Sequence, residues 1–255
     1  MKSRKIQFEN RDKLVLSGRL DLPDDENPRA YGIFAHCFTC SKNLNVVSNI
    51  NRSLTARGLG ILRFDFTGLG ESDGAFADTN FSTNVADLEE AYHFMAEQVA
   101  TPQLLIGHSL GGAAVLRAAA ALPSVNAVVT IGAPSDPSHV QHLFADHKDQ
   151  IYAAGEAQVQ LAGRPFKIKK HFLDDLAEHV LGESITKLKR PLLVCHAPFD
   201  NTVGIENASE IFGLARHPKS FLSLDGADHL LSAGEDSRYA GHVIAAWAEK
   251  YLDLN

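Results

Sequence analysis

Two serines in this 255-residue chain stand in the pattern Gly-x-Ser-x-Gly, which can present a serine hydroxyl as a nucleophile. Ser109 follows the apolar run QLLI and precedes the run GAAVLRAAAAL, an order typical of a strand, a sharp turn and a helix. Ser72 lies in FDFTGLGESDGAFADTN, where glycine, aspartate and asparagine dominate. We therefore predict that Ser109 is a nucleophile and that Ser72 belongs to a glycine-rich loop.

A nucleophilic serine needs a base to take its proton and a carboxylate to orient that base. Further along the sequence from such a serine, the acid comes first and the histidine second, each in a loop that follows a strand. Asp200 follows the apolar run PLLVC and His229 follows KSFLSL, so we predict Asp200 as the acid and His229 as the base. Asp136, after the run VNAVVTI, is the alternative acid. Asp228 adjoins His229, and chain neighbours rarely point at one another, so we expect it to be loop structure.

Acyl transfer also needs two fixed main-chain N–H groups to hold the oxyanion that develops. We predict one from Leu110, directly after the nucleophile, and one from Phe38, in the loop HCFTC after the run YGIFA. The rings of Phe38 and Phe199 are predicted to contact the substrate, and packing in the core is the alternative for both.

The elements that must position these residues alternate between short apolar runs and amphipathic stretches. Strands are predicted at residues 31–35, 59–64, 103–106, 125–131, 191–195 and 219–224. Apolar residues at helical spacing predict helices over residues 44–57, 84–99, 112–122 and 239–252. This alternation indicates an α/β fold, with a mostly parallel sheet and helices on both faces. IQFEN and LVLSGRLDLP predict an antiparallel hairpin ahead of it.

One stretch, at about residues 135–190, is too long for an ordinary connection between core strands. It holds helical pieces around 138–152 and 169–182, and the segment AQVQLAGRPFKI predicts a hairpin that turns at Ala162-Gly163. We predict that it is a lid inserted into a single domain spanning residues 1–255.

The composition of the chain disfavours several classes of partner and cofactor. There are 31 acidic and 24 basic residues, a net charge of −7, which disfavours nucleic acid. No apolar run approaches the roughly 20 residues of a membrane span. Cys37, Cys40 and Cys195 are too few for a disulfide framework, so we expect reduced thiols in a cytoplasmic protein. A redox role for Cys37 and Cys40 stays open, whereas a zinc site there would need two more ligands.

The remaining titratable clusters are expected to be solvated. They are His139, His142 and His147, and Lys167, Lys169 and Lys170, all in the long segment. We expect no metal, no cofactor and a small-molecule ester as the substrate.

The elbow GHSLGG, the loop HCFTC, the run RFDFTGLGES and the predicted acid and histidine loops resemble the α/β-hydrolase superfamily, from Lys5 to Leu252. AHCFTCSKN, FDFTGLGES, IGHSLGGAAV and LAGRPFKIKKHFLDDL are similar to one subfamily of esterase-like hydrolases. Many of its members are fused to a carboxy-terminal OsmC-like peroxide-reducing domain. The chain departs from the superfamily at Cys37, where glycine is usual. Whether it stands alone or is part of a longer protein, and whether it forms a homodimer, stays open.

The resemblance implies Ser109 as nucleophile, Asp200 as acid and His229 as base, with Phe38 and Leu110 at the oxyanion hole. Sequence and resemblance together favour a serine carboxylesterase that cleaves esters with small or medium acyl groups through an acyl-enzyme. An amide, peptide or thioester is the alternative bond, because the same triad serves many leaving groups. A non-catalytic partner module is disfavoured, because no member of the predicted triad is missing.

Overall fold

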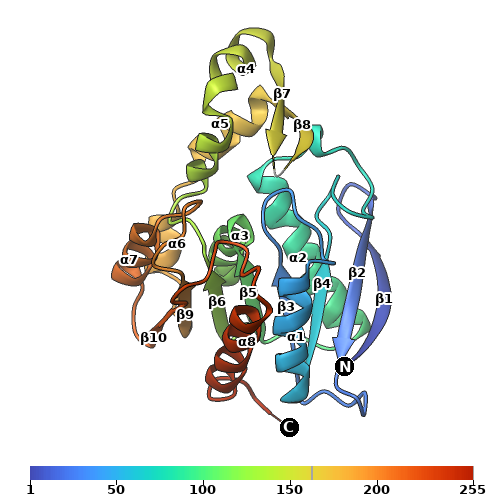
Figure 1. The fold of residues 1–255 in the computed structure, drawn as a ribbon. Coiled ribbons are helices and arrows are strands. Elements are labelled where there is room, and N and C mark those ends of the chain that lie inside the picture. Colours follow the sequence, from blue (N-terminus) through green and yellow to red (C-terminus); the bar gives the residue numbers. More distant parts are fainter. Residues whose placement is uncertain (162, 255) are drawn as a thin grey trace.

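An eight-stranded sheet forms the centre of the molecule (Figure 1). The computed structural model describes residues 1–161 and 163–254. In the order in which they pair, the strands are β1 (Lys2–Glu9), β2 (Val15–Leu22), β4 (Leu59–Phe64), β3 (Ala30–Ala35), β5 (Leu104–His108), β6 (Ala127–Ile131), β9 (Leu192–His196) and β10 (Lys219–Ser223). The pairs β1–β2 and β2–β4 are antiparallel, and all the others are parallel. The predicted sheet, with its antiparallel N-terminal hairpin, is confirmed.

Helices cover both faces of the sheet, as predicted. Helices α1 (Asn45–Ala56) and α8 (Gly234–Ala248) pack on one face, and the other face carries α2 (Phe81–Gln98), α3 (Leu110–Ala118), α6 (Leu181–Thr186) and α7 (Ile205–Leu214). Successive strand residues alternate between the two layers: Ile33 packs in the core with α2 and α3, and Phe34 packs with α1 and α8. Because both faces are buried, the strands carry continuous apolar runs in the sequence.

Three helices differ from what the apolar spacing predicted. Helix α2 begins at Phe81 rather than at residue 84, because Asn80 and Thr83 form a capping box. The Asn80 side chain accepts the Thr83 N–H at 2.8 Å, and the Thr83 hydroxyl accepts the Asn80 N–H at 2.8 Å. Helix α8 begins at Gly234 rather than at residue 239, and α7 was not predicted.

Residues 135–190, called the insertion below, connect β6 to β9, and most of the segment before α6 lies in the upper part of Figure 1. The insertion contains the 3₁₀ segment η3 (Pro137–His147), α4 (Lys148–Ala154), the antiparallel strands β7 (Glu156–Leu161) and β8 (Arg164–Lys169), α5 (Lys170–Glu178) and α6. The predicted hairpin is therefore present, but Ala162 of its predicted turn lies outside the described residues. In the parts that are described, no helix combines the length and apolar character needed to cross a membrane.

Candidate active site

Ser109 lies in a sharp turn between β5 and α3. Its φ of 54° and ψ of −125° lie outside the backbone regions that non-glycine residues favour, as expected of a nucleophile elbow. The turn is tight enough to exclude side chains at both flanking glycines. A Cβ at Gly107 would clash with the carbonyl oxygen of Gly111, and a Cβ at Gly111 would clash with the carbonyls of Ala35 and His36. The Gly-x-Ser-x-Gly pattern is thus a steric requirement of this turn.

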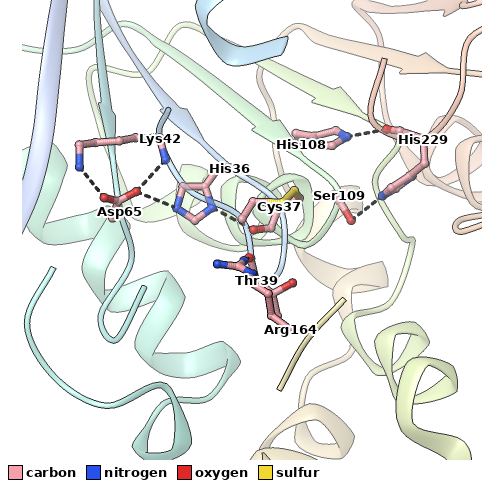
Figure 2. The surroundings of a disulfide bond; sticks show 10 residues. His36, Cys37, Thr39, Lys42, Asp65, His108, Ser109, Arg164 and His229 are labelled. Atoms are coloured by element: carbon pink, nitrogen blue, oxygen red, sulfur yellow. Dashed lines mark hydrogen bonds and ion pairs between the residues drawn. A yellow bond between two sulfur atoms is a disulfide. The ribbon is translucent and has the colours of Figure 1, made fainter. Parts of the chain in front are cut away.

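The side chains of Ser109, His229 and Asp200 form one hydrogen-bonded chain. Nδ1 of His229 lies 2.7 Å from Oδ2 of Asp200, and its Nε2 lies 3.1 Å from Oγ of Ser109, as Figure 2 shows for the serine. A carboxylate can only accept, so Nδ1 carries the proton and Nε2 is left to accept from the serine hydroxyl. All three residues are less than a tenth exposed. The arrangement can move the serine proton to the imidazole.

Asp200, in the loop that follows β9, is held by its own loop. Its Oδ1 accepts the N–H groups of Thr202 at 2.8 Å and Val203 at 2.9 Å. Burial by itself would raise the pKa of Asp200, but the hydrogen bonds from His229 and from these two main-chain N–H groups outweigh it. The pKa therefore lies below its usual range, and the carboxylate stays ionised beside the imidazole.

Gly132, directly after β6, lies against this pair. It has a φ of 54°, and a Cβ there would lie 3.4 Å from both Oδ2 of Asp200 and Nδ1 of His229. Any side chain at this position would be strained and would press on the hydrogen bond between the acid and the histidine.

Three more histidines, not predicted as site residues, end or follow strands β3, β5 and β9. Each ring contacts a main-chain carbonyl of a loop at the site: His36 Nδ1 that of Cys37 at 2.9 Å, His108 Nε2 that of His229 at 2.8 Å, and His196 Nε2 that of Val203 at 2.7 Å. A carbonyl only accepts, so in each case the ring nitrogen donates. Among the described residues, the other ring nitrogen of each has no hydrogen-bond partner.

Burial lowers the pKa of His36 and lowers that of His108 to about 3, so both rings are neutral near pH 7. The three histidines thus fix three different loops of the site to the strand ends. Their place directly after the apolar runs YGIFA, QLLIG and PLLVC is the signal that was available in the sequence.

Residues 36–42, called the β3 loop below, are tied down by a buried ion pair. Lys42 is 1% exposed and forms an ion pair with Asp65, which is fully buried (Figure 2). The Lys42 N–H also donates to Oδ1 of Asp65 at 2.6 Å, and Arg63 donates to the Lys42 carbonyl at 2.6 Å. The end of the β3 loop is therefore fixed to the loop that follows β4.

Cys37 and Cys40 are joined by a disulfide within the β3 loop. The prediction of reduced thiols is wrong for this pair, whereas Cys195 is free and buried in β9. The two cysteines are the first and last residues of a four-residue turn, closed by a 3.1 Å hydrogen bond from the Cys40 N–H to the Cys37 carbonyl. Sequence separation alone could not decide between thiols and a disulfide.

Phe38 and Leu110, the predicted oxyanion donors, border one narrow crevice of about 10 Å³. Leu110 is the first residue of α3, so its N–H has no partner within the helix. In the described part of the chain, no turn or loop hydrogen bond uses the N–H of Phe38. Neither N–H has a partner within its own helix or loop, and the role of both as oxyanion donors stays a prediction.

The two aromatic rings predicted to contact substrate differ in surroundings. The Phe38 ring packs at 5.5 Å, centroid to centroid, from both Phe76 and Phe172, so the core alternative holds in part for it. Phe199 is 87% exposed, which excludes core packing. A substrate contact by either ring stays a prediction.

The other candidates from the sequence have structural roles. Asp136 caps the start of η3 by accepting the Ser138 N–H at 2.8 Å, so it is not placed as the acid. Asp228 accepts the Ser232 N–H at 2.8 Å, and Ser72 donates to the Asp65 carbonyl at 2.6 Å. The insertion lysines form surface ion pairs, namely Lys167 with Glu156, Lys169 with Asp78 and Lys170 with Asp174. In residues 1–161 and 163–254, no group of three or more His, Cys, Asp or Glu side chains could hold a metal ion.

Just over half of the chain matches the model of a known protein family. The model described as serine aminopeptidase, S33 matches residues 27–162, just over half of the chain. The chain belongs to this family. The matched part contains Ser109 and ends before Asp200 and His229, so the second half of the site is placed by the structure rather than by the match.

Solved structures and curated proteins agree with this assignment. An esterase domain from Rhodothermus marinus is 50% identical, with a TM-score of 0.81, and the match covers 98% of this chain and 99% of that domain. Est1E from Butyrivibrio proteoclasticus, solved with ferulic acid bound, has a TM-score of 0.79 over 96% of this chain and 98% of its own; at 19% identity it shows the fold alone. The mouse (Mus musculus) mitochondrial palmitoyl-protein thioesterase ABHD10 is 28% identical over 178 residues, 66% of this chain.

The match spans 59% of the length of that mouse thioesterase, so the chain corresponds to only part of it. Together, these matches show that the chain is an α/β-hydrolase that is similar to an esterase domain and to a thioesterase.

Proposed function

We propose that the protein hydrolyses carboxylic esters through an acyl-enzyme on Ser109. The observation that carries the proposal is the hydrogen-bonded chain from Ser109 through His229 to Asp200. His229 takes the serine proton as Oγ attacks the ester carbonyl, and the N–H groups of Phe38 and Leu110 hold the oxyanion. His229 then protonates the departing alcohol. In the second half of the reaction it activates water, which releases the acid and restores the serine.

The narrow crevice beside the nucleophile supports a small or medium acyl group. The residues that line it include the aromatic residues Phe38, Phe66 and Phe76, and its volume of about 10 Å³ holds roughly one water. An acyl chain that enters must displace these rings. Phe38 and Phe76 also pack against Phe172 of the insertion, at 5.5 and 6.5 Å, so displacement costs more for each further carbon. The insertion would act as the lid over this crevice.

The test uses 4-nitrophenyl acetate, butyrate and dodecanoate with the wild type and with Ser109→Ala. We expect acetate and butyrate to be hydrolysed with much higher kcat/KM than dodecanoate, and Ser109→Ala to fall to the background rate. Ser72→Ala is the matched control, because Ser72 occupies the second Gly-x-Ser-x-Gly pattern. Loss of activity in Ser72→Ala with retention in Ser109→Ala would overturn the proposal.

A thioester is the second candidate bond, and one observation favours it: the mouse relative is a palmitoyl-protein thioesterase. The same residues would serve a thiolate leaving group as they serve an alkoxide, since the attack and the oxyanion are alike. The test compares kcat/KM for two butyryl substrates that differ only in whether oxygen or sulfur links the acyl group to the leaving group. The substrate with the higher kcat/KM identifies the preferred bond. An aminoacyl 4-nitroanilide, assayed beside them, tests the amide alternative that the S33 family description raises.

A non-catalytic partner module is the remaining alternative. A fluorophosphonate probe distinguishes it, because the probe phosphonylates only an activated serine. Absence of label on Ser109 in the folded protein would favour the module.

A further inference from the structure

The disulfide lies within the candidate active site. Cys37 and Cys40 enclose Phe38 and Thr39, so the bond spans the residue predicted to supply one oxyanion donor. Figure 2 shows Cys37 between the buried pair of Lys42 and Asp65 on one side and Ser109 with His229 on the other. A change in this bond is therefore a change in the β3 loop at the nucleophile.

The turn that the disulfide closes contains an unfavourable backbone conformation. Thr39 has a φ of 61°, in the left-handed region, which β-branched residues rarely adopt. Such a conformation persists only where the surroundings enforce it. Here the enforcing contacts are the disulfide, the hydrogen bond from Cys40 to Cys37, and Arg164 of the insertion, which donates to the Thr39 carbonyl.

We propose that the Cys37–Cys40 disulfide is a redox-active site at which a small dithiol or a dithiol protein reduces the enzyme to a less active form. The proposal rests on the proposed function, because the Phe38 N–H matters only if an oxyanion binds beside Ser109. In the oxidised protein, the turn closed by the disulfide holds the Phe38 N–H in place. In the reduced protein, the covalent bond that closes this turn is gone.

The exchange takes place at Cys40, because this residue is partly exposed whereas Cys37 is 4% exposed. A thiolate of the dithiol attacks Sγ of Cys40, the bond between the two cysteine sulfurs breaks, and Cys37 leaves as a thiolate that takes up a proton. The second thiol of the reductant then attacks the mixed disulfide and releases Cys40. Two electrons and two protons pass from the dithiol to the protein, and the dithiol becomes a disulfide.

Reduction breaks the bond between Cys37 and Cys40 but leaves both ends of the β3 loop attached. His36 still donates to the Cys37 carbonyl, and Lys42 still pairs with Asp65. The expected change is thus a relaxation of Thr39 and a reorientation of the Phe38 N–H rather than unfolding. Complete loss of an oxyanion donor lowers kcat by about 10²–10³-fold, so with the loop partly held we expect a loss of about 10–100-fold.

The test equilibrates the wild type with reduced or oxidised dithiothreitol, removes the reagent by anaerobic desalting, and assays 4-nitrophenyl butyrate. Thiols are counted after unfolding, and we expect one in the oxidised protein, from Cys195, and three in the reduced protein. We expect the reduced form to have a kcat about 10–100-fold lower with a similar KM, and reoxidation to restore it. Equal kcat values for forms with one and three thiols would overturn the proposal, as would a disulfide that resists reduction in the folded protein.

Two variants and a second readout make the test specific. The double variant Cys37→Ser/Cys40→Ser should match the reduced wild type and ignore dithiothreitol, whereas Cys195→Ala should respond as the wild type does. Far-ultraviolet circular dichroism checks that each form is folded. A fluorophosphonate that labels neither form at Ser109 would overturn the proposed function, and this inference with it. Labelling of both forms at the same rate would overturn only the redox inference.

Discussion

His108 should make the folded protein less stable in mild acid. Burial lowers its pKa from 6.5 to about 3, and its ring is 1% exposed. Between those two pH values the unfolded chain binds a proton that the folded protein does not bind, so the free energy of unfolding falls as the pH falls. Above pH 6.5 the titration of His108 has little effect on stability. Below pH 6.5 it lowers the free energy of unfolding by up to about 1.4 kcal/mol per pH unit toward pH 3. From pH 7 to pH 5, the loss from His108 is about 2 kcal/mol.

Two substitutions separate this titration from the hydrogen bond that His108 donates to the His229 carbonyl. His108→Gln keeps an N–H donor of similar reach but does not titrate, so its stability should fall by about 2 kcal/mol less than that of the wild type between pH 7 and pH 5. His108→Leu removes the donor and leaves the buried carbonyl unpaired, which should cost about 1–3 kcal/mol at both pH values. Because the loop that holds His229 then loses its anchor, kcat should fall in the leucine variant and largely persist in the glutamine variant.

The measurement is urea unfolding of the three proteins at pH 5 and pH 7, followed by the fluorescence of Trp247, the one tryptophan. Other titrating groups contribute equally to all three, so the differences isolate His108. Identical losses between the two pH values in the wild type and in His108→Gln would refute the buried, neutral imidazole.

Three further predictions concern the acid, the ion pair and the crevice. Asp200→Asn should lower kcat by about 10³–10⁴-fold with little change in KM, because an amide no longer selects the right tautomer of the imidazole; steady-state assays check this, and an unchanged kcat would contradict it. Lys42→Met should cost about 3–5 kcal/mol in urea unfolding, because it strands the buried carboxylate of Asp65; Lys187→Ala, which removes an exposed pair, should change nothing measurable, and equal effects would contradict the burial. Phe76→Ala should enlarge the crevice and raise the ratio of kcat/KM for dodecanoate over acetate by 10-fold or more, about 1.4 kcal/mol; an unchanged ratio would remove the crevice as the acyl site.

The residues of the hydrogen-bonded chain were predictable because each depends on a local pattern. Ser109 stands between an apolar run and an alanine-rich run, and Asp200 and His229 lie in the loops that follow apolar runs. Parallel strands bring their carboxyl ends to one edge, so three loops far apart in the sequence meet there. Local sequence is enough to predict such residues, because the fold then brings their loops together.

The residues around the site depended on contacts that no local pattern records. Lys42 lies in the polar segment SKN, which is typical of solvated loops, but in the fold it is buried and pairs with Asp65, from the loop after β4. The disulfide depends on how the turn between Cys37 and Cys40 is closed, which sequence spacing leaves open. Helix α7 was missed, although Ala208 and Ile211 share one buried side.

The central claim is that the Ser109 hydroxyl is activated by His229. Peptide mapping by mass spectrometry after brief exposure to a fluorophosphonate tests it most directly. Ser109 should carry the adduct in the wild type, and the labelling rate should fall by 10³-fold or more in His229→Ala, about 4 kcal/mol in the barrier. An adduct on another serine, or equal labelling rates in the two proteins, would contradict the account.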